Sequence, residues 1–117
     1  MRTSDQKINP SLKNQITKLL AQSIADLKSL DEANTFLEDF LTVSEFESLS
    51  KRLAVAYWLR KGRSYSNIKR NLRVSSATVA TIQSKLGSEG FQLALKNIEA
   101  EEWANLWSKR IKNFVGK

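Results

Sequence analysis

Apolar residues recur at three- and four-residue steps along almost the whole chain, and this periodicity restricts the possible folds more than any other feature. The steps are clearest in residues 12–27 and 33–41, where the apolar side chains fall on one face of a helix. No alternating apolar and polar pattern of a strand competes with them. Four glycines and one proline are also few for an all-β chain, which needs many turns. We therefore predict an all-α protein with six or seven helices.

Capping residues predict where the first two helices begin. Pro10 suits the first turn of a helix, and either Asn9 or Ser11 can cap it. Residues 1–9 are polar, and we expect a flexible N-terminus there. Asp31 follows a break in the pattern and is the predicted cap of the second helix.

The third helix has the most distinct predicted start, because Ser44 and Glu47 have the spacing of a capping box. Gly62 is its predicted end. Between them, apolar residues cover two sides of the helix. A helix of this kind is expected to be buried between neighbours, including a second subunit.

Two short helices and two longer ones are predicted after Gly62. The first short helix covers residues 64–72, Arg73 and Val74 make a turn, and Ser75 or Ser76 caps a second helix that ends at Leu86. A further helix is expected from Ser88. A final helix is then expected to open with an acidic first turn at residues 99–103, which suits the helix dipole. Its aromatic residues are expected to pack in a core or dimer; they are Trp103, Trp107 and Phe114.

Positive charge is concentrated in one block of the chain. From Ser48 to Ser88 there are nine Lys or Arg residues and no Asp or Glu. The formal net charge is +7, so the remaining residues together are slightly acidic. The basic block also contains the two short helices, and this combination favours nucleic acid as the partner.

The two short helices have the apolar spacing of a helix-turn-helix. Such a motif needs apolar anchors between two helices and leaves one face of the second helix free for the major groove of DNA. The predicted anchors are Ile68, Leu72, Val74, Val79 and Ile82. The opposite face of the second helix is small and hydroxyl-bearing, which permits close approach to base edges and thymine methyl groups. Base contacts are expected from Ser76, Ala77, Ala80, Thr81 and Ser84, and phosphate contacts mainly from Arg63, Lys69, Arg70 and Lys85. The full set of candidate DNA-binding residues also includes Ser64, Ser75 and Thr78.

Residues Thr42 to Leu86 resemble the Trp repressor superfamily, and within it the YerC/YecD-like branch. The resemblance depends on LAVAYWLRKG at 53–62, YSNI at 65–68 and ATVATI at 77–82, and it covers roughly residues 25–98. Lys69 supports it, since the Trp repressor has a DNA-contacting lysine at this position. The resemblance implies an intertwined homodimer on double-stranded DNA, with two half-sites ~34 Å apart. We assign the helix-turn-helix domain to residues 10–99, and a C-terminal helical extension at 100–117 lies beyond the part that resembles the branch.

The chain departs from the family's tryptophan site. The resemblance places Thr42, Arg52 and Thr78 at a possible effector pocket. The second of the two arginines that sandwich tryptophan corresponds to Thr81, and the small glycine beside it corresponds to Ile82. We therefore expect no physiological tryptophan binding. Arg52 has a second interpretation, as an ordinary surface arginine of a long helix.

Other functional classes are less well supported by the composition. The chain has no Cys and no His, and no nucleotide-binding loop is recognisable, so we expect neither an enzyme nor a metal or other cofactor. No apolar run reaches the ~18 residues of a membrane span, and the polar start does not resemble a secretion signal, so a cytoplasmic location is expected. The leading hypothesis is a sequence-specific transcriptional regulator. A protein-interaction adaptor and a non-specific nucleic-acid binder remain the alternatives.

Overall fold

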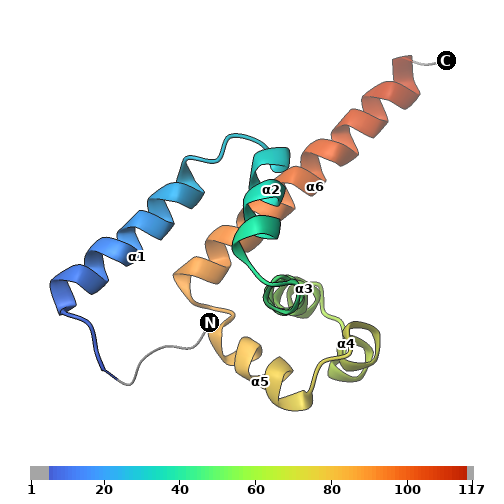
Figure 1. Ribbon diagram of the computed structural model, residues 1–117. Coiled ribbons are helices and arrows are strands. Elements are labelled where there is room, and N and C mark those ends of the chain that lie inside the picture. The colour runs from blue at the N-terminus through green and yellow to red at the C-terminus, as the bar shows by residue number, and fades with distance from the viewer. Residues whose placement is uncertain (1–5, 116–117) are drawn as a thin grey trace. The chain divides into compact units, whose positions relative to one another are not determined.

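The computed structural model describes residues 6–115, apart from the side chains of residues 107, 108 and 110–115. All regular elements in this part of the chain are helices, which confirms the predicted all-α class. The helices are α1 (Pro10–Ala25), α2 (Leu30–Phe40), α3 (Val43–Arg60), α4 (Tyr65–Leu72), α5 (Ser76–Lys85) and α6 (Glu89–Val115) (Figure 1). The chain forms two compact units, Met1–Phe46 and Glu47–Lys117, and each is described by itself. Part of the expected flexible N-terminus, residues 1–5, lies outside the described residues.

The first unit contains α1, α2 and the first turn of α3. Asn9 caps α1, because its side-chain oxygen accepts from the Ser11 N–H at 2.7 Å. The predicted cap of α2 was wrong: Ser29, rather than Asp31, accepts from the Glu32 N–H at 3.0 Å. Ser29 has the extended backbone (φ −148°, ψ 164°) that turns a cap side chain toward the first turn. Asp31 lies inside that turn, where its negative charge suits the helix dipole.

Much of the apolar surface of the first unit is not covered by the unit itself. No residue of α1 or α2 is buried. The apolar row of α1 remains between 42% and 67% exposed at Leu12, Ile16, Leu19, Leu20 and Ile24. Phe36 and Phe40 stack on each other in α2, with ring centroids 5.0 Å apart. An amphipathic helix whose apolar face stays in water gains little from folding, so this face needs a partner.

The capping box of α3 lies two residues before the predicted one. The Thr42 N–H donates to Glu45 Oε1 at 2.9 Å, and Thr42 Oγ1 accepts from the Glu45 N–H at 3.0 Å. The predicted Ser44–Glu47 box is therefore wrong, since both residues already lie inside the helix. The hydrogen bonds from the Thr42 backbone and side chain lower the pKa of Glu45, because they favour the carboxylate.

Gly62 ends α3, as predicted. Its backbone is left-handed with φ 84°, its N–H donates to the Leu59 carbonyl at 3.0 Å, and the Arg63 N–H donates to the Trp58 carbonyl at 3.1 Å. These two bonds form a Schellman motif, which commonly requires glycine at the left-handed position. The motif turns the chain sharply into α4.

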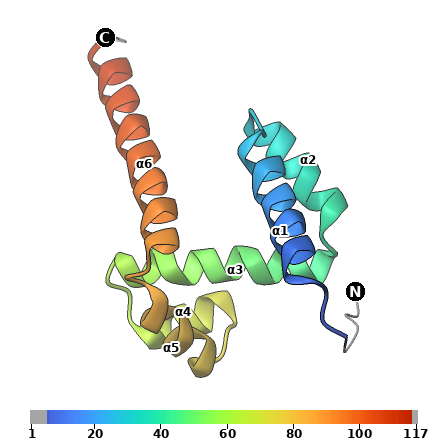
Figure 2. The same ribbon diagram turned by 90° about the vertical axis from the view of Figure 1, so that its left-hand side faces the viewer.

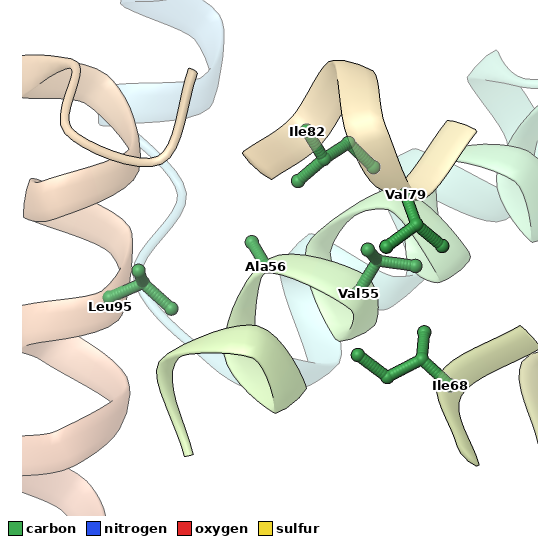
Figure 3. Close-up of a cluster of buried hydrophobic side chains, with 6 residues drawn as sticks. All are labelled: Val55, Ala56, Ile68, Val79, Ile82 and Leu95. Carbon is green, nitrogen blue, oxygen red and sulfur yellow. The ribbon is translucent and has the colours of Figure 1, made fainter. Parts of the chain in front are cut away.

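The core of the second unit connects four helices (Figure 3). It consists of Val55 and Ala56 from α3, Ile68 from α4, Val79 and Ile82 from α5, and Leu95 from α6. Val55 lies close to Val79 and Ile68, whereas Ala56 lies on the side of α3 that faces Leu95. The predicted anchors are confirmed, because Leu72 and Val74 pack against this cluster.

α6 is one continuous helix that begins beside the C-terminal end of α3 (Figure 2). The prediction of two helices here was wrong. Residues 98–105 contain no Gly or Pro and are rich in Ala and Glu, which favour an unbroken helix. The glutamates are thus mid-helix. Trp103 is 63% exposed, and the predicted packing of Trp107 and Phe114 falls on side chains outside the described residues. Over the described range, no helix is long and apolar enough to span a membrane.

Candidate nucleic-acid interface

The predicted order of helix, turn and helix is present in residues 64–86. Ser64 caps α4 by accepting from the Asn67 N–H at 3.1 Å, and Ser75 caps α5 by accepting from the Thr78 N–H at 3.1 Å. Only residues 73–75 separate the two helices, and buried Ile68 and Val79 fix one helix against the other through α3. The local sequence therefore specifies both helix starts, and the core specifies how the helices pack.

Arg73 makes the turn between α4 and α5 in the left-handed conformation, with φ 54° and ψ 56°. It is the only non-glycine residue with positive φ among those described. A left-handed L-residue costs roughly 1–2 kcal/mol, because its Cβ approaches the following carbonyl oxygen. The turn thus keeps the geometry that usually favours glycine, with an arginine in place.

The face of α5 opposite its buried residues is exposed and carries small side chains. Its exposed residues include all those predicted to contact bases: Ser76, Ala77, Ala80, Thr81 and Ser84. Thr81 Oγ1 donates to the Ala77 carbonyl at 2.8 Å, and Ser84 Oγ donates to the Thr81 carbonyl at 2.7 Å. These hydroxyls still have lone pairs that can accept hydrogen bonds. No long side chain of this set keeps a duplex away from the helix.

The N-terminus of α5 is a second polar feature of the same helix. The Ser75 and Thr78 hydroxyls lie 2.9 Å apart and share a hydrogen bond, so Thr78 takes part in the cap. The first amides of a helix have no partner within the helix, and the helix dipole adds positive potential there. Backbone amides at this end can therefore donate hydrogen bonds to a phosphate oxygen.

Seven of the nine cations of the basic block fall into two groups. Three of them pair with acids that lie outside the block: Lys51 with Glu47 at 3.2 Å, Arg60 with Glu99 at 3.3 Å, and Lys61 with Glu102 at 3.1 Å. All three lie in the N-terminal part of the basic block, within α3 or directly after it. The cations predicted to contact phosphate have no ion pair among the described residues, and all are exposed; they are Arg63, Lys69, Arg70 and Lys85.

Arg63 is held in place by two contacts. Its guanidinium lies over the Trp58 ring, with Cζ 3.9 Å from the ring centroid, and Nη1 donates to Asn67 Oδ1 at 3.4 Å. Stacking of this kind fixes the plane of the guanidinium and leaves other N–H groups free to bind an anion. The sequence analysis missed the role of Trp58. The tryptophan five residues before an arginine, with a predicted helix-ending glycine between them, could have suggested it.

A pocket of about 380 Å³ lies beside the exposed face of α5. It is lined by Arg52, Ala77, Thr78, Thr81, Ile82, Lys85 and Phe91. Two residues of the predicted effector pocket, Arg52 and Thr78, therefore lie together. Thr42 belongs to the first unit, where its side chain takes part in the capping box of α3.

Comparison with known proteins identifies the family. The family model described as Trp repressor protein matches residues 15–99. The uncharacterized protein YerC of Bacillus subtilis strain 168 is 35% identical over 85 residues, which cover 71% of this chain and 82% of YerC. The crystal structure of a TrpR-like protein from Eubacterium eligens ATCC 27750 has a TM-score of 0.69 and 36% identity, and the match covers 78% of this chain and 96% of that chain. The chain therefore belongs to the Trp repressor family.

Proposed function

We propose that this protein is a sequence-specific, DNA-binding transcriptional regulator that acts as a homodimer and inserts α5 into the major groove. The observation that carries the proposal is the exposed face of α5, which bears only small side chains. The cations predicted to bind phosphate around it form no ion pair among the described residues. Small side chains permit contact with base edges, and exposed cations supply the affinity for phosphates. Membership of the Trp repressor family supports the same function.

The proposal divides the contacts into two kinds. Base recognition is assigned to Ser76, Ala77, Ala80, Thr81 and Ser84. Phosphate binding is assigned to Arg63, Ser64, Lys69, Arg70, Ser75, Thr78 and Lys85. Phosphate contacts position a protein on the duplex, whereas contacts with base edges determine which sequence it prefers. The two groups are thus expected to respond differently to mutation.

Homodimerisation is supported by the uncovered apolar surface. The exposed row of α1 and the half-exposed Leu49 and Leu53 of α3 have too little cover in one chain. A second copy would supply that cover, because two identical apolar faces related by two-fold symmetry can bury each other. The two recognition helices would then contact half-sites about one helical turn, ~34 Å, apart.

The regulator is proposed not to respond to tryptophan. Thr81 cannot provide the guanidinium platform that the family uses to stack the indole. Ile82 is only 4% exposed and belongs to the core, so its branched side chain takes space beside the pocket. The domain assigned to DNA binding is residues 10–99, with residues 100–117 as a helical extension. Lys109, Arg110, Lys112 and Lys117 of that extension are candidates for further phosphate contacts.

A selection of duplexes tests the proposal. Random duplexes are incubated with the protein at ~0.15 M salt, and the bound molecules are sequenced. We expect enrichment of a two-fold symmetric motif. Equal retention of random duplex or RNA would instead indicate a non-specific nucleic-acid binder, and absence of salt-sensitive binding would favour a protein adaptor.

Two substitutions test the division of contacts. Lys69→Ala should weaken binding to all duplexes and reduce the slope of log K against log salt by about one. Thr81→Val should instead change the base preference at one position, at a cost of about 1–3 kcal/mol. Thr17→Val is the matched control for Thr81, because Thr17 Oγ1 makes the same kind of bond to the Lys13 carbonyl at 3.0 Å in α1. If the Lys69 and Thr81 variants behaved alike on a panel of duplexes, the division would be wrong.

A further inference from the structure

The C-terminal end of α5 is tied to the start of α6 by side chains. α5 ends at Lys85 with Leu86 as its C-cap, and the last carbonyls of a helix have no partner within it. Gln92 Nε2 donates to the Leu86 carbonyl at 2.7 Å, and Ser88 Oγ donates to the Lys85 carbonyl at 2.7 Å. Gln92, in the first turns of α6, therefore completes the cap of α5 from another helix.

The other end of the Gln92 amide connects to α3. Arg60 Nη1 donates to Gln92 Oε1 at 3.0 Å, and Arg60 Nε forms an ion pair with Glu99 Oε1 at 3.3 Å. The two ends of the amide are not interchangeable, because only its NH₂ can donate to a carbonyl and only its oxygen can accept from a guanidinium. A reversed amide would lose both bonds. The partners thus fix the orientation of Gln92, which is half-buried and joins the end of α3 to the end of α5.

This connection acts on the part of α5 that the core holds least. The core residues Val79 and Ile82 hold the first two turns of α5, whereas Leu86 is only partly buried. A helix that contacts base edges must keep its position closely, because hydrogen bonds weaken steeply with distance and angle. If the C-terminal end of α5 tilted, Ser84 and Thr81 would be displaced together.

We propose that Gln92 is a positioning residue that holds the recognition helix α5 against α3, with Arg60 and Glu99 holding Gln92 in turn. The inference rests on the function proposed for α5. It also assigns Arg60 a role within the protein and not on phosphate, although Arg60 belongs to the basic block.

Gln92→Glu separates positioning from simple packing. The variant keeps the size of the side chain and can still accept from Arg60, now as a charge-assisted bond. It replaces the donor to Leu86 by a carboxylate oxygen, which repels the carbonyl at pH 7. Asn97→Asp is the control, because it adds the same charge at an exposed position of α6. Gln92→Leu removes both bonds without adding charge and serves if the glutamate variant does not fold.

The first measurement is amide hydrogen exchange of the protein without DNA. We expect Gln92→Glu to accelerate exchange in the last turn of α5 by about threefold to tenfold, the effect of one lost hydrogen bond. Exchange in α4 should stay as in the control. Equal exchange in the Gln92→Glu and Asn97→Asp variants would overturn the proposal.

The second measurement is the ratio of Kd for random duplex to Kd for the duplex enriched by selection. Gln92→Glu should lower this ratio by about tenfold relative to Asn97→Asp, while the salt slope on random duplex stays the same. A purely structural role would lower both affinities together, and that result would refute positioning. If the wild-type protein prefers no duplex, the proposed function fails, and hydrogen exchange alone decides whether Gln92 holds α5.

Discussion

Replacement of Arg73 by glycine should stabilise the protein, although it removes a large side chain. Arg73 is the left-handed C-cap of α4, with φ 54° and ψ 56°. Its side chain is exposed and has no ion pair among the described residues. The substitution therefore changes mainly the backbone strain at the turn.

The expected magnitude is the difference between two effects. A left-handed L-residue costs roughly 1–2 kcal/mol in the folded state. Replacement by glycine removes that cost. Glycine also stabilises the unfolded chain by about 0.4–1 kcal/mol, because it has more conformational freedom there, and this offsets part of the stabilisation. We expect a net stabilisation of about 0.5–1 kcal/mol, which raises the Tm by about 2–5 °C for a protein of this size.

Urea denaturation at one fixed protein concentration measures the effect, since the stability of the proposed dimer depends on concentration. Arg73→Ala is the matched control: it removes the same charge, including any favourable effect on the C-terminal end of α4, but keeps Cβ and the strain. The glycine variant should be the more stable of the two. Equal free energies of unfolding for the glycine and alanine variants would refute the reasoning, because the strain at the turn would then be no larger than the ~0.4–1 kcal/mol by which glycine stabilises the unfolded chain.

Four further substitutions or conditions have definite expected outcomes. Ile68→Ala should cost about 2–5 kcal/mol in urea denaturation, because Ile68 is fully buried in the core cluster to which four helices contribute; a cost below about 1 kcal/mol would contradict the core described above. Gly62→Ala should cost only about 1–2 kcal/mol, from strain at φ 84° alone, since an added Cβ would meet no atom within 4 Å; a larger loss would indicate a clash. Glu45 stabilises α3 above its ordinary pKa of 4.5, and this contribution is lost as the pH falls through its lowered pKa in the folded state. Thermal melts of Glu45→Gln should therefore depend less on acid pH than those of the wild type, and identical pH profiles would exclude the capping role. Titration calorimetry with tryptophan should detect no micromolar binding, and a micromolar Kd would refute our interpretation of Thr81 and Ile82.

Local signals in the sequence predicted most of the fold correctly. The ends of α3, α4 and α5 depend on residues within one turn of the boundary, so Gly62 could be assigned from the chain alone. Ser75 and Ser76 remained two candidates for the cap of α5, and the structure identifies Ser75. The start of α3 could not, because Thr42–Glu45 and Ser44–Glu47 are two overlapping candidates for one capping box. The hydrogen bonds of Thr42 decide between them.

Contacts between distant residues were beyond the sequence analysis. The pairing of Arg60 with Glu99 joins positions 39 residues apart, and it depends on where α6 begins relative to α3. From the sequence we expected a new helix to begin near residue 99, which placed Glu99 in a first helical turn and did not suggest this pairing. The candidate base-contacting residues were easier to identify, because the exposed face of α5 follows from the helical period once Val79 and Ile82 are recognised as core.

The stacking of Arg63 on Trp58 gives the protein an intrinsic optical reporter. The excited state of an indole has a larger dipole than its ground state, so a cation held 3.9 Å above the ring shifts its emission energy. If a phosphate draws the guanidinium away, the fluorescence of Trp58 will change without any attached dye. Trp58→Phe removes the signal while it keeps an aromatic ring under Arg63. The contact that orders Arg63 as a candidate phosphate ligand therefore also allows phosphate binding by Arg63 to be followed through the fluorescence of Trp58.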